Sequence, residues 1–155
     1  MAANDDTTII ALSEAISFSS KARVNKELLT ASMAEVRMNC YEPGQITPMH
    51  MHPDEEEVMI VIEGNGELLF KEHDNLPIKQ GDLIHLPSDQ YHAIRAADDS
   101  QMVLVYFMKP GYNSLRPDQP IEDPTLTKAR RTVADTPRPA YLSMSKMNHV
   151  IARIC

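Results

Sequence analysis

Three histidines and one glutamate lie among runs of β-favouring residues. Their spacing constrains the fold of this chain more than any other feature. His50, His52 and Glu57 lie close together, and His92 follows a loop that begins after Pro87. Neutral imidazole nitrogens combined with a carboxylate oxygen suit a first-row transition metal. The sequence therefore indicates a metal site carried by β-strands.

Strand geometry supports this interpretation. Side chains alternate between the two faces of a strand, so His50 and His52 project to the same side and can share one ion. Glu57 lies an odd number of positions further on, and an uninterrupted strand would turn it to the opposite face. Pro53-Asp54 breaks the strand, because proline cannot donate to a ladder and Asp favours turns. We therefore expect Glu57 to begin the neighbouring antiparallel strand and to point back at the histidines.

Further turn residues locate the fourth candidate ligand. Residues 81–87 predict a turn followed by a short strand, and the loop after Pro87 returns the chain so that His92 starts another strand. Gly64-Asn65-Gly66 predicts a hairpin after the strand that begins at Glu57.

Short β-favouring runs separated by Gly, Pro and Asp extend over the middle of the chain, and such spacing favours a sandwich or barrel over a parallel sheet. The period of residues 11–18 fits either a short helix or a strand. The expected strands are residues 34–41, 46–52, 57–62, 67–71, 82–86, 91–96 and 101–108.

The C-terminal region has a different composition. Residues 110–139 contain six of the eleven prolines. Asp123-Pro124 offers an N-cap and a first-turn proline, which predicts a short surface helix after it. Residues 150–154 alternate as a strand would.

The candidate metal ligands and the glycines and proline around them resemble the motifs of the cupin superfamily. The first cupin motif is Gly, five residues, His-x-His, three or four residues, Glu, six residues and Gly. The second motif has Asp89 where glycine is usual and Ala96 where asparagine is usual; because Asp tolerates positive φ, we expect the loop at Asp89 to form. The resemblance covers about residues 33–108. The matching residues are Gly44, His50, His52, Glu57 and Gly64 for the first motif, and Gly81, Pro87 and His92 for the second.

By this resemblance the chain is all-β, an antiparallel double-stranded β-helix (a jelly-roll or cupin barrel) with a short C-terminal helix and an irregular tail. We expect a single domain over residues 1–155, with a barrel core at about 28–108 and a Pro-rich extension at 109–155. Spacing favours Glu57 over the adjacent Glu55 and Glu56. The metal ligands that the resemblance implies are His50, His52, Glu57 and His92.

A substrate pocket is expected beside the metal. Met59, Val61 and Ile94 should share the interior face with the ligands, which implies a largely apolar wall suited to a small organic substrate. Polar strand residues and one further histidine could also reach it, although a lone histidine is more often a surface or interface residue. These additional candidates are Arg37, Tyr106, Gln101 and His85.

Four protein ligands leave one or two positions open on an ion that prefers five or six, which favours a catalytic site over closed structural zinc. The leading hypothesis is a non-haem Fe(II) dioxygenase of the cupin type, acting on a β-diketone, thiol or phenolic substrate. A redox-neutral isomerase, cyclase or lyase that uses Zn, Mn or Ni is the second. A non-catalytic ligand-binding or sensory cupin is the third, because a fold does not fix a function.

Charge and hydropathy limit the partners. A formal net charge of −7 over 155 residues argues against nucleic acid, which requires a basic face. Apolar runs such as residues 58–62 are far too short to span a bilayer. Residues 1–20 lack the features of a secretory signal, so we expect a cytoplasmic protein. Cys40 and Cys155 fit no disulfide framework and are interpreted as ordinary thiols.

An apolar patch is expected on the outside of the barrel. Val58, Ile60 and Ile62 alternate with the interior residues of their strand, as do Met49 and Met51 with the histidines. A homodimer is the simplest way to cover such a patch.

Overall fold

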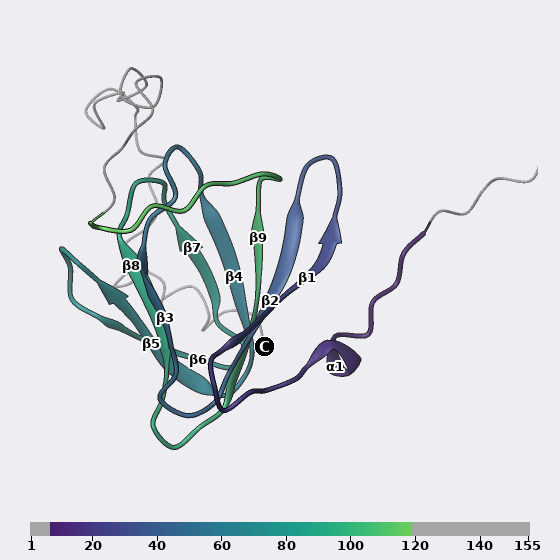
Figure 1. The fold of residues 1–155 in the computed structure, drawn as a ribbon, viewed down its shortest axis with the longest axis horizontal. Coiled ribbons are helices and arrows are strands. Elements are labelled where there is room, and N and C mark those ends of the chain that lie inside the picture. The colour runs from purple at the N-terminus through teal and green to yellow at the C-terminus, as the bar shows by residue number, and fades with distance from the viewer. Residues whose placement is uncertain (1–6, 119–155) are drawn as a thin grey trace, which may run out of the picture. The chain divides into compact units, whose positions relative to one another are not determined.

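The computed structural model describes residues 7–118, which form two antiparallel β-sheets that face each other (Figure 1). The five-stranded sheet has the order β1-β2-β9-β4-β7, and the four-stranded sheet has the order β3-β8-β5-β6. The all-β, antiparallel barrel expected from the sequence is confirmed. The helix and the strand expected after residue 120 lie outside the described residues.

All seven predicted strands are present, with ends that differ by a few residues. Two further strands were not predicted: β1 alternates polar and apolar residues without a strong apolar run, and β6 is short and contains Pro77. The strands are β1 (Val24–Thr30), β2 (Glu35–Tyr41), β3 (Ile46–His50), β4 (Glu57–Glu63), β5 (Asn65–Phe70), β6 (Leu76–Lys79), β7 (Leu83–Leu86), β8 (His92–Ala96) and β9 (Met102–Met108).

The connection at Gly64 differs from the expectation. β4 pairs with β7 and β9, whereas β5 pairs with β6 and β8, so Gly64 carries the chain from one sheet to the other. The hairpin prediction was wrong, because glycines mark sheet crossings as well as hairpins. Gly64 has φ 76°, and a Cβ there would lie 1.9 Å from the backbone oxygen of Gln101.

The main hydrophobic core lies between the two sheets. Met59 and Val61 of β4 are almost fully buried within it, as the alternation of that strand predicts. Burying such a side chain contributes about 1.5–3 kcal/mol relative to exposure. The buried members of this cluster are Tyr41, Met59, Val61, Leu68, Ile78, Leu86, Ile94, Ala96, Met102, Leu104, Tyr106 and Met108.

A second cluster covers the outer face of the five-stranded sheet. Its buried centre is formed by β2 and β9 and includes Met38 and Val105. Part of the cover comes from the N-terminal segment, where the four-residue helix α1 (Leu12–Ala15) and the residues after it pack on the sheet. Ile62 belongs to this cluster, so the chain itself covers part of the predicted outer patch. Val58 remains 36% exposed, and the homodimer stays a prediction.

Two smaller findings concern the reactivity of the Cys40 thiol and the question of a membrane-spanning helix. Cys40 is buried in the outer cluster, and burial raises the pKa of its thiol, which disfavours a reactive thiolate. Within residues 7–118 the structure has no helix that is long and apolar enough to cross a membrane.

Replacing Gly64 with Ala should destabilise the barrel more than replacing Gly81 with Ala. Both glycines have positive φ, which costs a residue with a Cβ about 1–2 kcal/mol. Only at Gly64 does the new Cβ also meet backbone, whereas at Gly81 no atom lies within 4 Å. Urea unfolding of the two variants measures the difference, and equal losses of unfolding free energy would contradict this account of the crossing.

Candidate metal centre

The four candidate ligands come from both sheets and meet at one end of the barrel. His50 is the last residue of β3 and lies opposite His92, the first residue of β8. Glu57 is the first residue of β4, which belongs to the other sheet. The expectation that Glu57 lies on the strand adjacent to the histidines was therefore wrong. The turn after Pro53, with Asp54 at φ 59°, instead takes the chain across the barrel so that Glu57 faces the histidines from the opposite side.

The ligand atoms converge. One nitrogen from each of the three histidines and one carboxylate oxygen of Glu57 all lie within 4.8 Å of one another. Oε2 of Glu57 lies 3.3 Å from Nε2 of His92 and 3.5 Å from Nε2 of His52. Three of the four residues are buried, and His50 is partly buried at the edge of the cluster. A cluster this compact can place all four donors around one divalent ion.

Backbone carbonyls orient all three imidazole rings. Nδ1 of His50 lies 2.8 Å from the carbonyl oxygen of Pro48, and Nδ1 of His92 lies 2.9 Å from that of Gln90. Nδ1 of His52 lies 2.7 Å from the carbonyl oxygen of Asn113. A carbonyl only accepts, so each Nδ1 carries the proton and donates it. Each Nε2 is thereby left as a lone pair, which is the form that binds metal.

Two buried atoms of the cluster are suited to binding a cation. Oε2 of Glu57 and Nε2 of His92 are inaccessible to solvent and have no hydrogen-bond partner. Buried polar atoms are normally paired, because an unpaired one costs free energy. A divalent ion would satisfy both, so the residues present fit the metal that the sequence implies.

The charges of the cluster also suit a cation. Burial, together with the neighbouring imidazole of His92, lowers the pKa of His50 to about 4, so this ligand is neutral at physiological pH. Burial would raise the pKa of Glu57, but the imidazoles of His52 and His92 lower it to about 2, so this ligand is anionic. His50 then offers a neutral nitrogen and Glu57 a negative oxygen.

The loop before His92 forms despite its unusual residue. Asp89 has φ 62°, the conformation that a glycine would adopt easily, and its backbone N–H donates to the carbonyl oxygen of His52 at 3.0 Å. Asp is among the residues that tolerate this region. The expectation that the loop survives without glycine is confirmed, and the loop supplies the Gln90 carbonyl that orients His92.

A cavity of about 680 Å³ adjoins the ligands. Its wall is mainly polar, which corrects the expected apolar wall. The cavity is lined by Arg23, Asn25, Arg37, Asn39, Thr47, Pro48, His50, His52, Glu57, Ile94, Tyr106, Tyr112, Ser114 and Arg116.

The predicted pocket residues separate into three groups. Ile94, Arg37 and Tyr106 line this cavity. Met59 and Val61 share the interior face but are buried in the core. His85 and Gln101 do not line it. Gln101 is exposed and donates to Glu42, and His85 is exposed in a separate hollow, where its Nε2 lies 3.4 Å from Oε2 of Glu56. The alternation of β7 decides this, because Leu86 rather than His85 points into the core.

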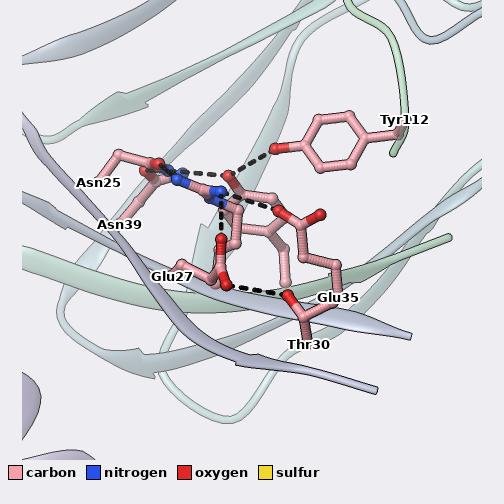
Figure 2. A network of polar contacts seen from close by, with 8 residues as sticks. Asn25, Glu27, Thr30, Glu35, Asn39 and Tyr112 are labelled. Carbon is pink, nitrogen blue, oxygen red and sulfur yellow. Dashed lines mark hydrogen bonds and ion pairs between the residues drawn. The ribbon is translucent and has the colours of Figure 1, made fainter. Parts of the chain in front are cut away.

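A polar network forms the side of the cavity that belongs to the five-stranded sheet (Figure 2). Nδ2 of Asn25 donates to Oδ1 of Asn39 at 2.7 Å and to the hydroxyl of Tyr106 at 2.8 Å. Arg37 donates from Nε and a terminal nitrogen to Oδ1 of Asn25, at 3.0 and 2.7 Å. The hydroxyls of Tyr106 and Tyr112 lie 3.3 Å apart.

The segment after β9 completes the site and was not predicted. Tyr112 packs edge-on against the ring of His52, with ring centroids 5.3 Å apart. Asn113 provides the carbonyl for His52, and Leu115 exchanges two backbone hydrogen bonds with Met51, each 2.9 Å long. The segment follows Pro110 and Gly111 and has no strand period, so nothing in its sequence places it near the histidines.

Residues 37–108 match the family model described as "Cupin domain". They form a cupin domain. The chain is 30% identical over 108 residues to auxin-binding protein ABP19b of Prunus persica, covering 62% of this chain and 50% of that protein. It is 32% identical over 85 residues to auxin-binding protein 1 of Arabidopsis thaliana, covering 49% of this chain and 42% of the relative. The chain thus spans about half the length of the curated relatives it matches.

Solved structures share the fold. A protein with a double-stranded β-helix domain from Klebsiella pneumoniae has a TM-score of 0.68 at 20% identity, covering 77% of this chain and 98% of that one. The polyketide cyclase RemF from Streptomyces resistomycificus has a TM-score of 0.58 at 19% identity, covering 67% and 76%. At these identities the similarity concerns the fold alone.

Replacing His92 with Ala should abolish stoichiometric metal binding while leaving the barrel folded. Loss of an outer-shell partner typically costs about 10- to 100-fold in metal affinity, and loss of a ligand should cost more. Metal analysis after dialysis, with circular dichroism for the fold, measures both effects. His85→Ala is the matched control and should retain full metal content. Full binding by the His92→Ala protein would contradict the four-ligand cluster.

Metal affinity should fall as the pH drops below neutrality. Burial would lower the pKa of His52, but the Glu57 carboxylate and the Asn113 carbonyl raise it above its ordinary value of 6.5. His52 must lose this proton to bind metal, so protons compete with the ion below that pKa, by about tenfold per pH unit for one proton. Competitive Zn(II) titrations at a series of pH values test this. A constant affinity across that range would refute it.

Proposed function

We propose that this protein is a metal-dependent enzyme for a small organic substrate, and specifically a cytoplasmic non-haem Fe(II) dioxygenase. The observation that carries the proposal is the convergence of four ligand atoms beside a cavity of about 680 Å³, which three of the ligands, His50, His52 and Glu57, help to line. Structural zinc sites are closed by four protein ligands, without an open position facing a cavity. The donor set here has space beside it for a substrate.

His50, His52, Glu57 and His92 would hold the ion. Bound Fe(II) would supply redox chemistry with dioxygen, because four protein ligands leave room for further donors on an ion that prefers six. The surrounding residues define what enters: Ile94 offers an apolar contact, whereas Arg37 and Tyr106 belong to the polar network. Substrates with oxygen donors, such as β-diketones and phenols, suit such a wall, and small thiols are the third class.

A redox-neutral isomerase, cyclase or lyase that uses Zn, Mn or Ni is the second candidate, and one observation favours it. The Tyr106 hydroxyl accepts a hydrogen bond from Asn25, so its own proton is free to be donated to Tyr112 or to a substrate. Burial and the Tyr106 hydroxyl raise the pKa of Tyr112, so the Tyr112 phenol stays protonated at neutral pH. A tyrosine pair beside the ligands, with hydroxyl protons to donate, suits general-acid chemistry.

A non-catalytic binding protein is the third candidate. The names of two relatives describe them as auxin-binding proteins, and they match this chain at 30% and 32% identity over part of its length. Such a protein would use the same cavity and would bind a small organic ligand without turnover.

Dioxygen uptake separates the first candidate from the other two. Protein purified without added metal should contain a stoichiometric transition metal, and its anaerobic Fe(II) form should bind nitric oxide with a change in the electronic spectrum. Uptake should then be measured with a panel of β-diketones, thiols and catechols, with the His92→Ala protein as the control. Stoichiometric Fe(II) that neither nitric oxide nor any substrate perturbs would exclude the dioxygenase.

Tyr106→Phe tests the second candidate. Removing a general acid typically lowers turnover by about 10²- to 10⁴-fold. If the reaction is redox-neutral, we expect such a loss in kcat with unchanged metal content. A dioxygenase that does not need this proton would lose far less, so steady-state kinetics of the variant discriminate between the two.

A further inference from the structure

The cavity carries a positive lining inside an acidic protein. The chain has a formal net charge of −7, yet its cavity is lined by Arg23, Arg37 and Arg116, with Glu57 as the one carboxylate among the described lining residues. Glu57 belongs to the metal centre, where its Oε2 lies 3.3 Å from Nε2 of His92 and 3.5 Å from Nε2 of His52. An arginine of this lining that keeps its charge uncompensated would favour an anion over a neutral molecule.

Arg37 is not the group available to that anion. One of its terminal nitrogens lies 2.8 Å from Glu35 and 3.5 Å from Glu27, and the rest of its guanidinium holds Asn25. Figure 2 shows these carboxylates and Asn25 gathered in one network. The charge of Arg37 is thus compensated, and its role is to position Asn25.

Arg23 differs from Arg37 in this respect. Its guanidinium donates to Oδ1 of Asn39 at 2.6 Å, and it forms no ion pair with any carboxylate among residues 7–118. A guanidinium has five N–H donors in a planar fork, so most of those of Arg23 remain for a ligand. Such a fork matches a carboxylate in a bidentate arrangement.

Asn39 fixes the direction of Arg23. Asn39 is 5% exposed, and its Oδ1 accepts from both Arg23 and Asn25. Asn25 is in turn held by Arg37. The network therefore orders the arginine before a ligand arrives, which reduces the entropy cost of binding.

We propose that the ligand of this cavity is a small organic carboxylate, with an oxygen donor for the metal at one end and its carboxylate on Arg23 at the other. This inference rests on the proposed function, because it uses the open metal site as one of the two binding points. It adds that the substrate is an acid and that Arg23 determines the specificity for the charge.

Paired probes test the charge directly. The anaerobic Fe(II) protein is titrated with 4,6-dioxoheptanoate, a β-diketone with a carboxylate tail, and with its neutral methyl ester; chelation is followed by absorption. A second pair, the acid and the methyl ester with one more methylene between the diketone and the carboxylate, tests a longer distance between the metal and Arg23. For at least one pair the acid should bind about tenfold more tightly than the ester, as one charge-assisted hydrogen-bonded pair implies.

Arg23→Gln assigns the effect to one residue. The ratio of acid to ester affinity should fall to about one, with the affinity for the ester and the metal content unchanged. Arg95→Gln is the matched control: it removes one positive charge from an arginine that pairs with Asp98 and does not line the cavity, so the ratio should persist.

The outcomes separate this inference from the proposed function. Equal binding of acid and ester by the wild-type protein would overturn the carboxylate specificity and leave the open metal site intact; this comparison requires no variant. A preference for the acid that survives Arg23→Gln would overturn the assignment to Arg23. Failure of every probe to perturb bound Fe(II) would overturn the open site, and the carboxylate inference with it.

Discussion

A carboxylate buried among three imidazoles is the interaction on which the rest of the structure depends. Glu57 is 4% exposed, and its Oε2 has no hydrogen-bond partner. Leaving a charge in such a place is costly unless a cation compensates it. The carbonyls that aim the imidazoles come from three separate segments, so the loop at Gln90 and the segment at Asn113 have to be in place as well. A metal would link both sheets and the chain after β9 through one ion.

The strands and the ligands could be predicted because they depend on local patterns. Alternation and turn residues locate seven strands, and ligand spacing identifies His50, His52, Glu57 and His92, which the structure brings together. The error at Gly64 has a physical cause. A glycine with positive φ fits a hairpin and a sheet crossing equally well, and the distinction depends on whether β5 pairs with β4 or with β8. That pairing is non-local.

The wall of the cavity could not be predicted for the same reason. The polar network depends on β1, which the sequence did not reveal, and on registers that place Asn25 opposite Asn39 and Arg37 opposite Tyr106. Alternation within one strand says which residues share a face, but not which residues of other strands they meet. Met59 and Val61 were assigned to the correct face of their strand, yet they lie in the core and not in the cavity wall. The position of a residue along the strand decides whether it reaches the core or the cavity.

The apolar and the polar side of the barrel interior therefore have different roles. Apolar residues from both sheets hold the sandwich together, whereas the face formed by β1 and β2 gives up apolar contacts for a hydrogen-bonded network. Such a network is stable only if its members are satisfied, and here Glu27 and Glu35 satisfy Arg37 from the rim. Arg23 is the member that lacks a carboxylate among the residues described. In an otherwise compensated network, an uncompensated cation marks the position that a ligand would complete.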